Sequence, residues 1–196
     1  MTTEQMKKLV KKRLSQKRYR HTVNVAKSAV KLARRYGADE QKAEMAALLH
    51  DAAKELPKDE MLRILNQDAI IAQTAIHRPT AVWHGLCAAI LAEKEWGITD
   101  PEILSAVACH TAGKPGMSKL DKIIYLSDMI CEERDYPEVH TLRKLAEQDL
   151  DLATATAVEM NLNWMHEKGK TIDPVSQQAL EDLRRCVQPK GGNTHE

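Results

Sequence analysis

An adjacent histidine and aspartate, His50 and Asp51, follow the apolar residues of the stretch LLHDAAKEL. An imidazole and a carboxylate are costly to bury unless other groups partner them. Neighbouring residues of a helix point about 100° apart, so a single metal would have to sit off the helix end to reach both side chains. Two metals suit the pair better, with His50 on one ion and Asp51 bridging both through its two oxygens.

Further histidines and one aspartate stand on the apolar faces of other predicted helices. They are His21, His84, His110 and Asp128. A single histidine of this kind is more often a satisfied core residue than a metal ligand. Four histidines and two aspartates from five helices are better explained by a metal site, which helical proteins build in the bundle core. Histidine-rich ligation with carboxylates favours iron, manganese or zinc over magnesium.

The elements that must position these residues are helices, because apolar residues recur with helical periodicity along nearly the whole chain. Caps and stops mark several helix boundaries, among them Gly37, Asp39, Ser118 and Gly169. We expect a less regular stretch from Asn66 to Pro79, and long helices over roughly 137–168 and about 174–186. The alternation typical of strands is absent. The predicted fold class is therefore all-α, a helical bundle with a metal site in its core.

The composition shows no break that would divide the 196 residues into two domains. We expect one domain over residues 1–187, with the metal-binding core at about 18–130 and a disordered tail at 188–196. The 29 basic and 28 acidic residues leave a net charge of +1, which does not favour binding to nucleic acid or to a membrane surface. No apolar run approaches the ~20 residues that cross a bilayer, and the N-terminus lacks a signal-peptide pattern. We therefore expect a cytoplasmic protein.

The order His21, His50-Asp51, Asp128 resembles the HD superfamily of metal-dependent phosphohydrolases, which is named for the adjacent pair. His84 and His110 match the extra histidines of its two-metal members. The sequence is more similar still to the YqeK family of HD proteins. The similar segments are RYRHTVNVA at 18–26, KAEMAALLHDAAKELPKDEM at 42–61, VWHG at 82–85, CHTAGKPGMSKLDKIIYLSD at 109–128 and RDYPEVHTLRKLAEQDL at 134–150. The resemblance covers about residues 4–186.

The resemblance implies a symmetrical bis(5′-nucleosyl)-tetraphosphatase, which splits diadenosine tetraphosphate into two ADP with metal-activated water. The implied metal is iron, two ions per chain, with manganese or another divalent metal as the alternative. The implied ligands of one ion are His21, His50, Asp51 and Asp128. The other ion would share Asp51 and add His84 and His110. Asp51, His84 and His110 are then the expected catalytic residues.

Three cations lie close in sequence to these ligands: Arg18, Lys54 and Arg134. Their short spacing from the ligands predicts that they reach the same site and bind phosphate. A solvated surface position is the common alternative for lysine and arginine. The expected partner is a dinucleoside polyphosphate or another ADP-type nucleotide, with no nucleic acid and no membrane, and a homodimer is one possible oligomeric state.

The segment TIDPVS at 171–176 resembles the nucleotide-contacting turn of the family, which implies Thr171 and Ser176 as substrate-binding residues. The chain departs from the family in this region, because Ser176 and Glu181 stand where the family usually carries Thr and Asn. It also has Cys131-Glu132 where the family usually has an acidic residue followed by proline. These departures concern nucleotide binding and leave the expected metal ligands unchanged.

Three other functions remain open on the sequence. The first is an HD phosphohydrolase that acts on a nucleoside triphosphate or an alarmone nucleotide. The second is a di-iron oxygenase on the same scaffold, since histidine and aspartate ligation suits both chemistries. The third is an HD-like scaffold that only binds partners, although such a protein would not need all six ligands.

Overall fold

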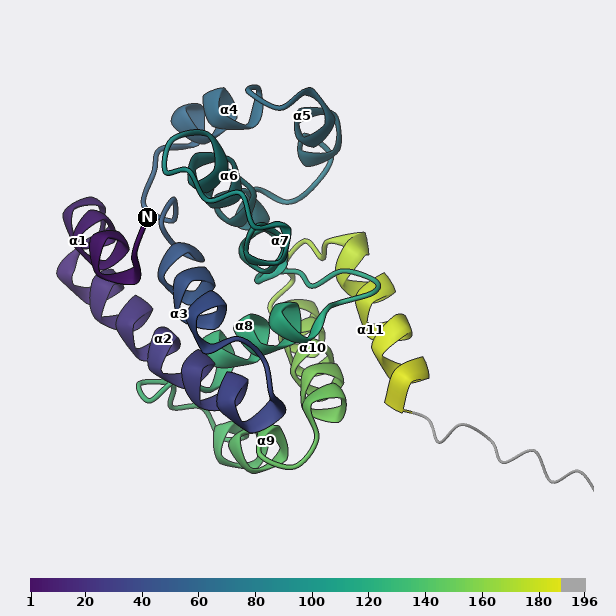
Figure 1. Ribbon diagram of the computed structural model, residues 1–196. Helices are drawn as coiled ribbons and strands as arrows, with labels where there is room; N and C mark the ends of the chain where they lie inside the picture. Colours follow the sequence, from purple (N-terminus) through teal and green to yellow (C-terminus); the bar gives the residue numbers. More distant parts are fainter. Residues whose placement is uncertain (188–196) are drawn as a thin grey trace, which may run out of the picture.

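The computed structural model describes residues 1–187, which form eleven α-helices and one short 3-10 helix and contain no strand (Figure 1). The all-α fold class is thereby confirmed. The helices are α1 (Thr3–Arg13), α2 (Gln16–Tyr36), α3 (Glu40–Leu49), α4 (Lys58–Leu65), α5 (Ala69–Ala75), α6 (Trp83–Lys94), α7 (Pro101–Cys109), α8 (Lys119–Ile130), α9 (Val139–Ala146), α10 (Leu150–Glu167) and α11 (Pro174–Val187), with η1 (Thr80–Val82) before α6. The tail predicted to be disordered, residues 188–196, lies outside the described residues.

The predicted helix boundaries arise from local hydrogen bonds. The Asp39 side chain accepts from the first backbone N–H groups of α3, and Ser118 forms a capping box with Asp121 at the start of α8. Gly37 ends α2 with a φ of 61°, a left-handed conformation that costs glycine little. The caps at Asp39 and Ser118 set where α3 and α8 begin. Two residues of the predicted metal site, His50 and Asp51, follow the end of α3, and α8 carries Asp128.

Two stretches differ from the expectation, and both contain an aspartate cap. The less regular stretch from Asn66 to Pro79 includes α5, because Asp68 accepts from two backbone N–H groups of that helix. The range 137–168 is divided between α9 and α10, which are separated at 147–149. Asp149 accepts from the N–H groups of residues 151 and 152 and thereby starts α10 as a new helix.

Helix α3 occupies the middle of the bundle, where it contacts α1, α2, α6, α7 and α8 (Figure 1). Its small residues Ala43, Ala46 and Ala47 are fully buried and allow neighbouring helices to approach closely, and Leu48 and Leu49 are also fully buried. Each buried leucine contributes roughly 1.5–3 kcal/mol relative to an exposed one. The C-terminal end of α3, where His50 and Asp51 follow, is therefore fixed inside the core.

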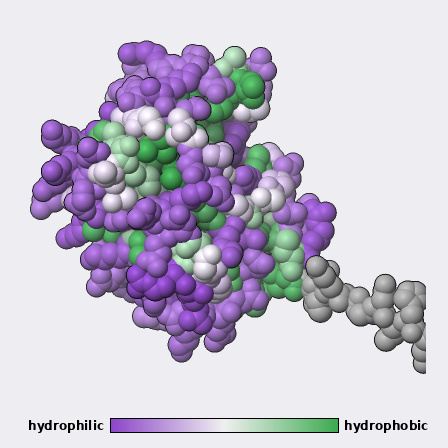
Figure 2. Space-filling model, in the orientation of Figure 1, coloured by the Kyte–Doolittle hydropathy of each residue, from purple (hydrophilic) through white to green (hydrophobic). Residues whose placement is uncertain are grey.

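The C-terminal helices extend the bundle on one side. Helix α10 packs on α8, α9 and α11, and α11 reaches the loop after α7, where the Asp182 carboxylate accepts from the Gly116 N–H at 2.7 Å. Hydrophilic residues cover most of the face in Figure 2, with separate small hydrophobic patches. Among the helices described for residues 1–187, none has the length and apolar character needed to cross a membrane.

Candidate metal centre

The six predicted ligands lie together inside the bundle, and they come from five helices as the sequence predicted. The members are His21 on α2, His50 and Asp51 at the end of α3, His84 on α6, His110 at the end of α7, and Asp128 on α8. All except Asp128 are buried. The hydrophobic core therefore surrounds a polar cluster that its own helices bring together.

Asp51 lies at the centre of this cluster, and each of its two oxygens faces a different pair of histidines. Oδ2 is 3.8 Å from His21 Nε2 and 3.6 Å from His50 Nε2. Oδ1 is 3.2 Å from His84 Nε2 and 3.8 Å from His110 Nε2. Within each of the two groups, the ligand atoms lie within 4.8 Å of one another. Each of these two groups could hold a metal ion, and Asp51 belongs to both.

Local backbone contacts orient two of the histidines. His50 Nδ1 lies 2.6 Å from the Ala47 carbonyl oxygen, and His110 Nδ1 lies 2.8 Å from the Val107 carbonyl oxygen. Both carbonyls belong to the last turn of a helix, where acceptors lack a helical partner. When Nδ1–H donates to such a carbonyl, Nε2 is left free as a ligand and points toward Asp51.

His21 is oriented by a carboxylate that the sequence analysis did not single out. Its Nδ1 is 2.6 Å from Glu133 Oε1, and Asn24 Nδ2 donates to Glu133 Oε2 at 2.8 Å. On the other side of the ring, His21 Nε2 is 3.0 Å from Asp128 Oδ1. Glu133 follows α8 in an irregular segment, where no periodicity indicates the direction of a side chain.

Thr111 is a second residue that the sequence analysis did not identify. Its Oγ1 is 3.1 Å from His110 Nε2 and 3.3 Å from His84 Nε2. The two Nε2 atoms are themselves 3.0 Å apart. A hydroxyl in this place can donate to or accept from a group held between the two imidazoles.

The protonation states suit metal ligation. Burial lowers the pKa of His50 and of His84 to about 4, so both imidazoles are neutral at pH 7. Burial would raise the pKa of Asp51, but His50, His110 and His84 hold it well below its usual value. Burial also opposes the charge of His21, yet the carboxylates of Asp128 and Glu133 raise its pKa to about 10. A metal at His21 Nε2 would therefore displace a proton.

Two of the buried ligand atoms, His21 Nε2 and His50 Nε2, make no hydrogen bond of good geometry, although His21 Nε2 forms an ion-pair contact with Asp128 Oδ1. Buried polar atoms are rarely left unpaired in native structures. The neutral imidazoles of His50 and His84 beside ionised carboxylates, with the unpartnered Nε2 of His50 directed at Asp51, are a donor set that suits a divalent transition metal. The residues present therefore fit the implied metal.

The three predicted cations all contact the cluster. Arg18 Nη1 is 2.8 Å from Asp51 Oδ2, and Arg134 Nη2 bonds Asp128 Oδ1 while its Nε donates to the Asp128 carbonyl at 2.7 Å. Lys54 Nζ is 4.0 Å from Asp51 Oδ1 and partly exposed, and burial lowers its pKa. Each cation thus lies between the buried ligands and the solvent.

Thr171 and Ser176 lie apart from this arrangement. Thr171 is exposed, whereas Ser176 is buried and its N–H donates to the Asp173 carbonyl. Within residues 1–187, neither residue hydrogen-bonds to the six-residue cluster. The buried Asp173 carboxylate instead pairs with Arg78 Nε at 2.7 Å, which ties the turn before α11 to the segment before α6. Nucleotide contacts by Thr171 and Ser176 stay a prediction.

Comparisons with known proteins place this geometry in context. A family model described as HD domain matches residues 18–133. The chain is 40% identical over 174 residues to the symmetrical bis(5′-nucleosyl)-tetraphosphatase of Bacillus subtilis, covering 89% of this chain and 93% of that protein. It is 39% identical over 166 residues to the protein of that name from Halalkalibacterium halodurans, covering 85% and 88%. A Clostridium acetobutylicum crystal structure, described as a predicted HD superfamily hydrolase involved in NAD metabolism, matches with a TM-score of 0.86 and 32% identity over 95% of this chain and 98% of that one.

Proposed function

The chain belongs to the HD-domain family, and we propose that it is a metal-dependent hydrolase that splits diadenosine tetraphosphate symmetrically into two molecules of ADP. Relatives named for this activity match nearly the whole chain at about 40% identity. The observation that carries the proposal is Asp51, whose two oxygens face separate pairs of histidines. That arrangement suits a reaction on a polyphosphate, in which several anionic oxygens must be held at once.

The proposed ligands form two sets around the shared Asp51. One set adds His21, His50 and Asp128, and the other adds His84 and His110. Iron is the proposed metal, as two ions per chain, and manganese or another divalent metal would be held by the same donors. When bound, such a metal polarises phosphate oxygens and makes water more acidic.

The chain's own residues would bind and orient the substrate. Arg18, Lys54 and Arg134 lie at the solvent side of the cluster and are proposed to contact phosphate oxygens. The reaction adds one water across the bond between the second and third phosphates. The water oxygen bonds to one of these phosphorus atoms. The bond between that phosphorus and the bridging oxygen breaks, and the bridging oxygen leaves with the second ADP. The cations stabilise the charge that develops on this leaving group.

The regiochemistry of the products tests the proposal. Purified protein with added metal is incubated with diadenosine tetraphosphate, and the products are separated by ion-exchange chromatography. ADP as the single nucleotide product is expected, since symmetrical cleavage gives no other. ATP and AMP in equal amounts would mean asymmetrical cleavage. Faster turnover of a nucleoside triphosphate or an alarmone than of diadenosine tetraphosphate would identify another nucleotide as the substrate and contradict the proposal.

A further inference from the structure

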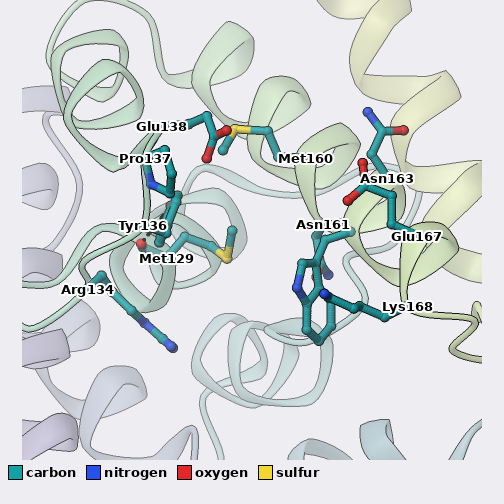
Figure 3. Close-up of a pocket in the computed structure, with 11 residues that line it drawn as sticks. Met129, Arg134, Tyr136, Pro137, Glu138, Met160, Asn161, Asn163, Glu167 and Lys168 are labelled. Atoms are coloured by element: carbon teal, nitrogen blue, oxygen red, sulfur yellow. Dashed lines mark hydrogen bonds between the residues drawn. The ribbon is translucent and has the colours of Figure 1, made fainter.

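A cavity of about 700 Å³ lies beside the metal centre. It is bordered by the end of α8 and the segment after it on one side and by α10 on the other. Figure 3 shows Met129, Tyr136 and Arg134 across the cavity from Asn161 and Lys168. The volume lies within the roughly 300–1,000 Å³ of small-molecule sites, and none of the metal ligands lines it.

Arg134 connects this cavity to the metal centre. Its side chain lines the cavity, while its guanidinium bonds the carboxylate and the carbonyl of Asp128. A molecule whose phosphates reach the cluster can therefore extend past Arg134 and place its other end in the cavity. The cavity is thus positioned for the uncharged end of a ligand whose anionic end lies at the metals.

The wall on α10 has the chemistry that a planar ring requires. Met160 and Trp164 lie one turn apart on one face of α10, and Lys168, the residue that caps the C-terminal end of the helix, follows one turn later. Trp164 is 52% exposed, although most large hydrophobic side chains of the described chain are buried. An aromatic face stacks on any base, and the thioethers of Met160 and Met129 make favourable contacts at ring edges.

The polar groups of the cavity fit a nucleoside better than a phosphate. Asn161 and Asn163 each carry a donor and an acceptor, the combination that pairs with the edge of a purine. The carboxylates of Glu138 and Glu167 can accept hydrogen bonds that ribose hydroxyls donate, and their negative charge repels anions. Of the two cations in the lining, Arg134 also contacts Asp128 at the metal centre, which places the phosphate that follows the nucleoside at the Arg134 side.

We propose that this cavity binds the adenosine of one ADP half of the substrate, with Trp164 as the stacking platform and Arg134 holding the phosphate that follows. This inference rests on the proposed function and names a subsite for the nucleoside. Only the tertiary structure brings α10 opposite residues 129–138. The departures from the family motif around Ser176 lie outside the lining of this cavity.

The test compares Trp164→Ala and Trp164→Phe with Ile70→Ala, a matched truncation of an exposed hydrophobic residue on α5 that does not line the cavity. Binding of ADP and of inorganic tripolyphosphate to each metal-loaded protein is measured by calorimetry, with circular dichroism as a control for folding. Base–aromatic stacking is worth roughly 1–3 kcal/mol on alanine substitution. Trp164→Ala should therefore weaken ADP binding roughly five- to 150-fold and leave tripolyphosphate binding unchanged. Trp164→Phe should retain most of the affinity.

Kinetics give a second readout for the same variants. Stacking that is equal in the ground state and the transition state affects KM alone, so Trp164→Ala should raise KM for diadenosine tetraphosphate and keep kcat. Unchanged ADP binding in Trp164→Ala, or an equal loss of ADP and tripolyphosphate binding, would overturn the nucleoside subsite. If the wild-type protein binds ADP but does not cleave the dinucleotide, the proposed function fails while the binding measurements still decide the subsite.

Discussion

At the scale of single residues, Asp51 is the carboxylate that contacts both histidine pairs and a cation. Its oxygens face both histidine pairs, and Oδ2 also pairs with Arg18 at 2.8 Å. The side chain is almost completely buried, so its charge depends on the surrounding partners rather than on water. Replacing it should therefore affect both proposed metal sites together.

Asp51→Ala should abolish turnover and reduce bound metal at both sites, since it removes the only ligand that the two sets share. The helical content should remain, because α3 ends before this residue. Metal per chain by elemental analysis and helicity by circular dichroism check both parts. An Asp51→Ala protein that retains activity would exclude the bridging role.

Glu133 provides a more specific prediction, since it holds His21 without belonging to either ligand set. Glu133→Ala should lower metal affinity roughly tenfold to a hundredfold, the usual effect of removing a partner that orients a ligating histidine. Glu133→Gln should restore much of the affinity because the amide oxygen still accepts from Nδ1–H. The control is Glu132→Ala, an exposed neighbour. Equal affinities of the Glu132 and Glu133 alanine variants, measured by chelator competition, would remove the positioning role.

Lys54 separates substrate binding from metal binding. A charged hydrogen bond to phosphate is worth roughly 1.5–3 kcal/mol, so Lys54→Ala should lower kcat/KM about tenfold to a hundredfold at full metal content. Lys58→Ala, an exposed lysine at the start of α4, is the control. Steady-state kinetics give kcat/KM, and elemental analysis gives the metal content of both variants. A Lys54→Ala enzyme with the same kcat/KM as the control would contradict a contact between Lys54 and phosphate.

At the scale of elements, the metal centre depends on how closely α6 approaches the end of α7. A Cβ atom at Gly85 would lie 3.0 Å from the Val107 carbonyl oxygen and 3.1 Å from His110 Cε1. These distances are too short for ordinary contact, and one of the partners is backbone. The absence of a side chain at this position therefore allows His84 and His110 to face the same oxygen of Asp51.

Gly85→Ala tests this helix contact. The added methyl should displace His110 or push α7 away, at a cost of about 1–3 kcal/mol in unfolding free energy, as for other overpacked cores. Metal bound at the His84–His110 site should fall, and activity with it. Urea unfolding and metal analysis give the two readouts. Wild-type values in both would mean that the contact between α6 and α7 adjusts without affecting the ligands.

At the scale of the whole molecule, the buried histidines predict how the stability of the metal-free protein depends on pH. His50 and His84 have a pKa of about 4 when folded and roughly 6.5 when unfolded. The unfolded chain therefore binds more protons below pH 6.5, and stability falls as the pH drops toward 4. His21, with a folded pKa of about 10, acts in the opposite sense. Its stabilisation is complete below pH 6.5 and is lost as the pH rises toward 10.

Chelator-treated protein should consequently be most stable near pH 6.5, with a slope approaching 1.4 kcal/mol per pH unit for each shifted histidine. The metal-loaded protein should lack the alkaline decline, because a metal on His21 replaces the proton. Urea titrations from pH 4.5 to pH 9 on both forms measure this difference. In this interpretation His21 is protonated in the metal-free protein and binds the metal in the loaded one. An unfolding free energy that does not fall above pH 6.5 without metal, or that falls equally steeply with metal, would contradict it.

The sequence by itself determined the helical fold class, most helix boundaries, the family and the six residues that converge. These follow from local patterns, because apolar periodicity, caps and glycine stops act over a few residues. The polar exceptions on apolar faces identified His21, His84, His110 and Asp128 as inward-facing. One domain over residues 1–187 and the roles of Thr171 and Ser176 remain predictions of the sequence.

Only the tertiary structure decided which oxygen of Asp51 faces which histidines, that Glu133 holds His21, and that Trp164 lies in a cavity beside Arg134. Glu133 lies 112 residues from His21 in the chain, in a segment without periodicity, so its direction is set by packing after α8. The division of α9 from α10 likewise depends on Asp149, whose capping bonds outweigh continuation of the helix. Such contacts join parts of the chain that no local pattern relates, and they form only when the bundle packs.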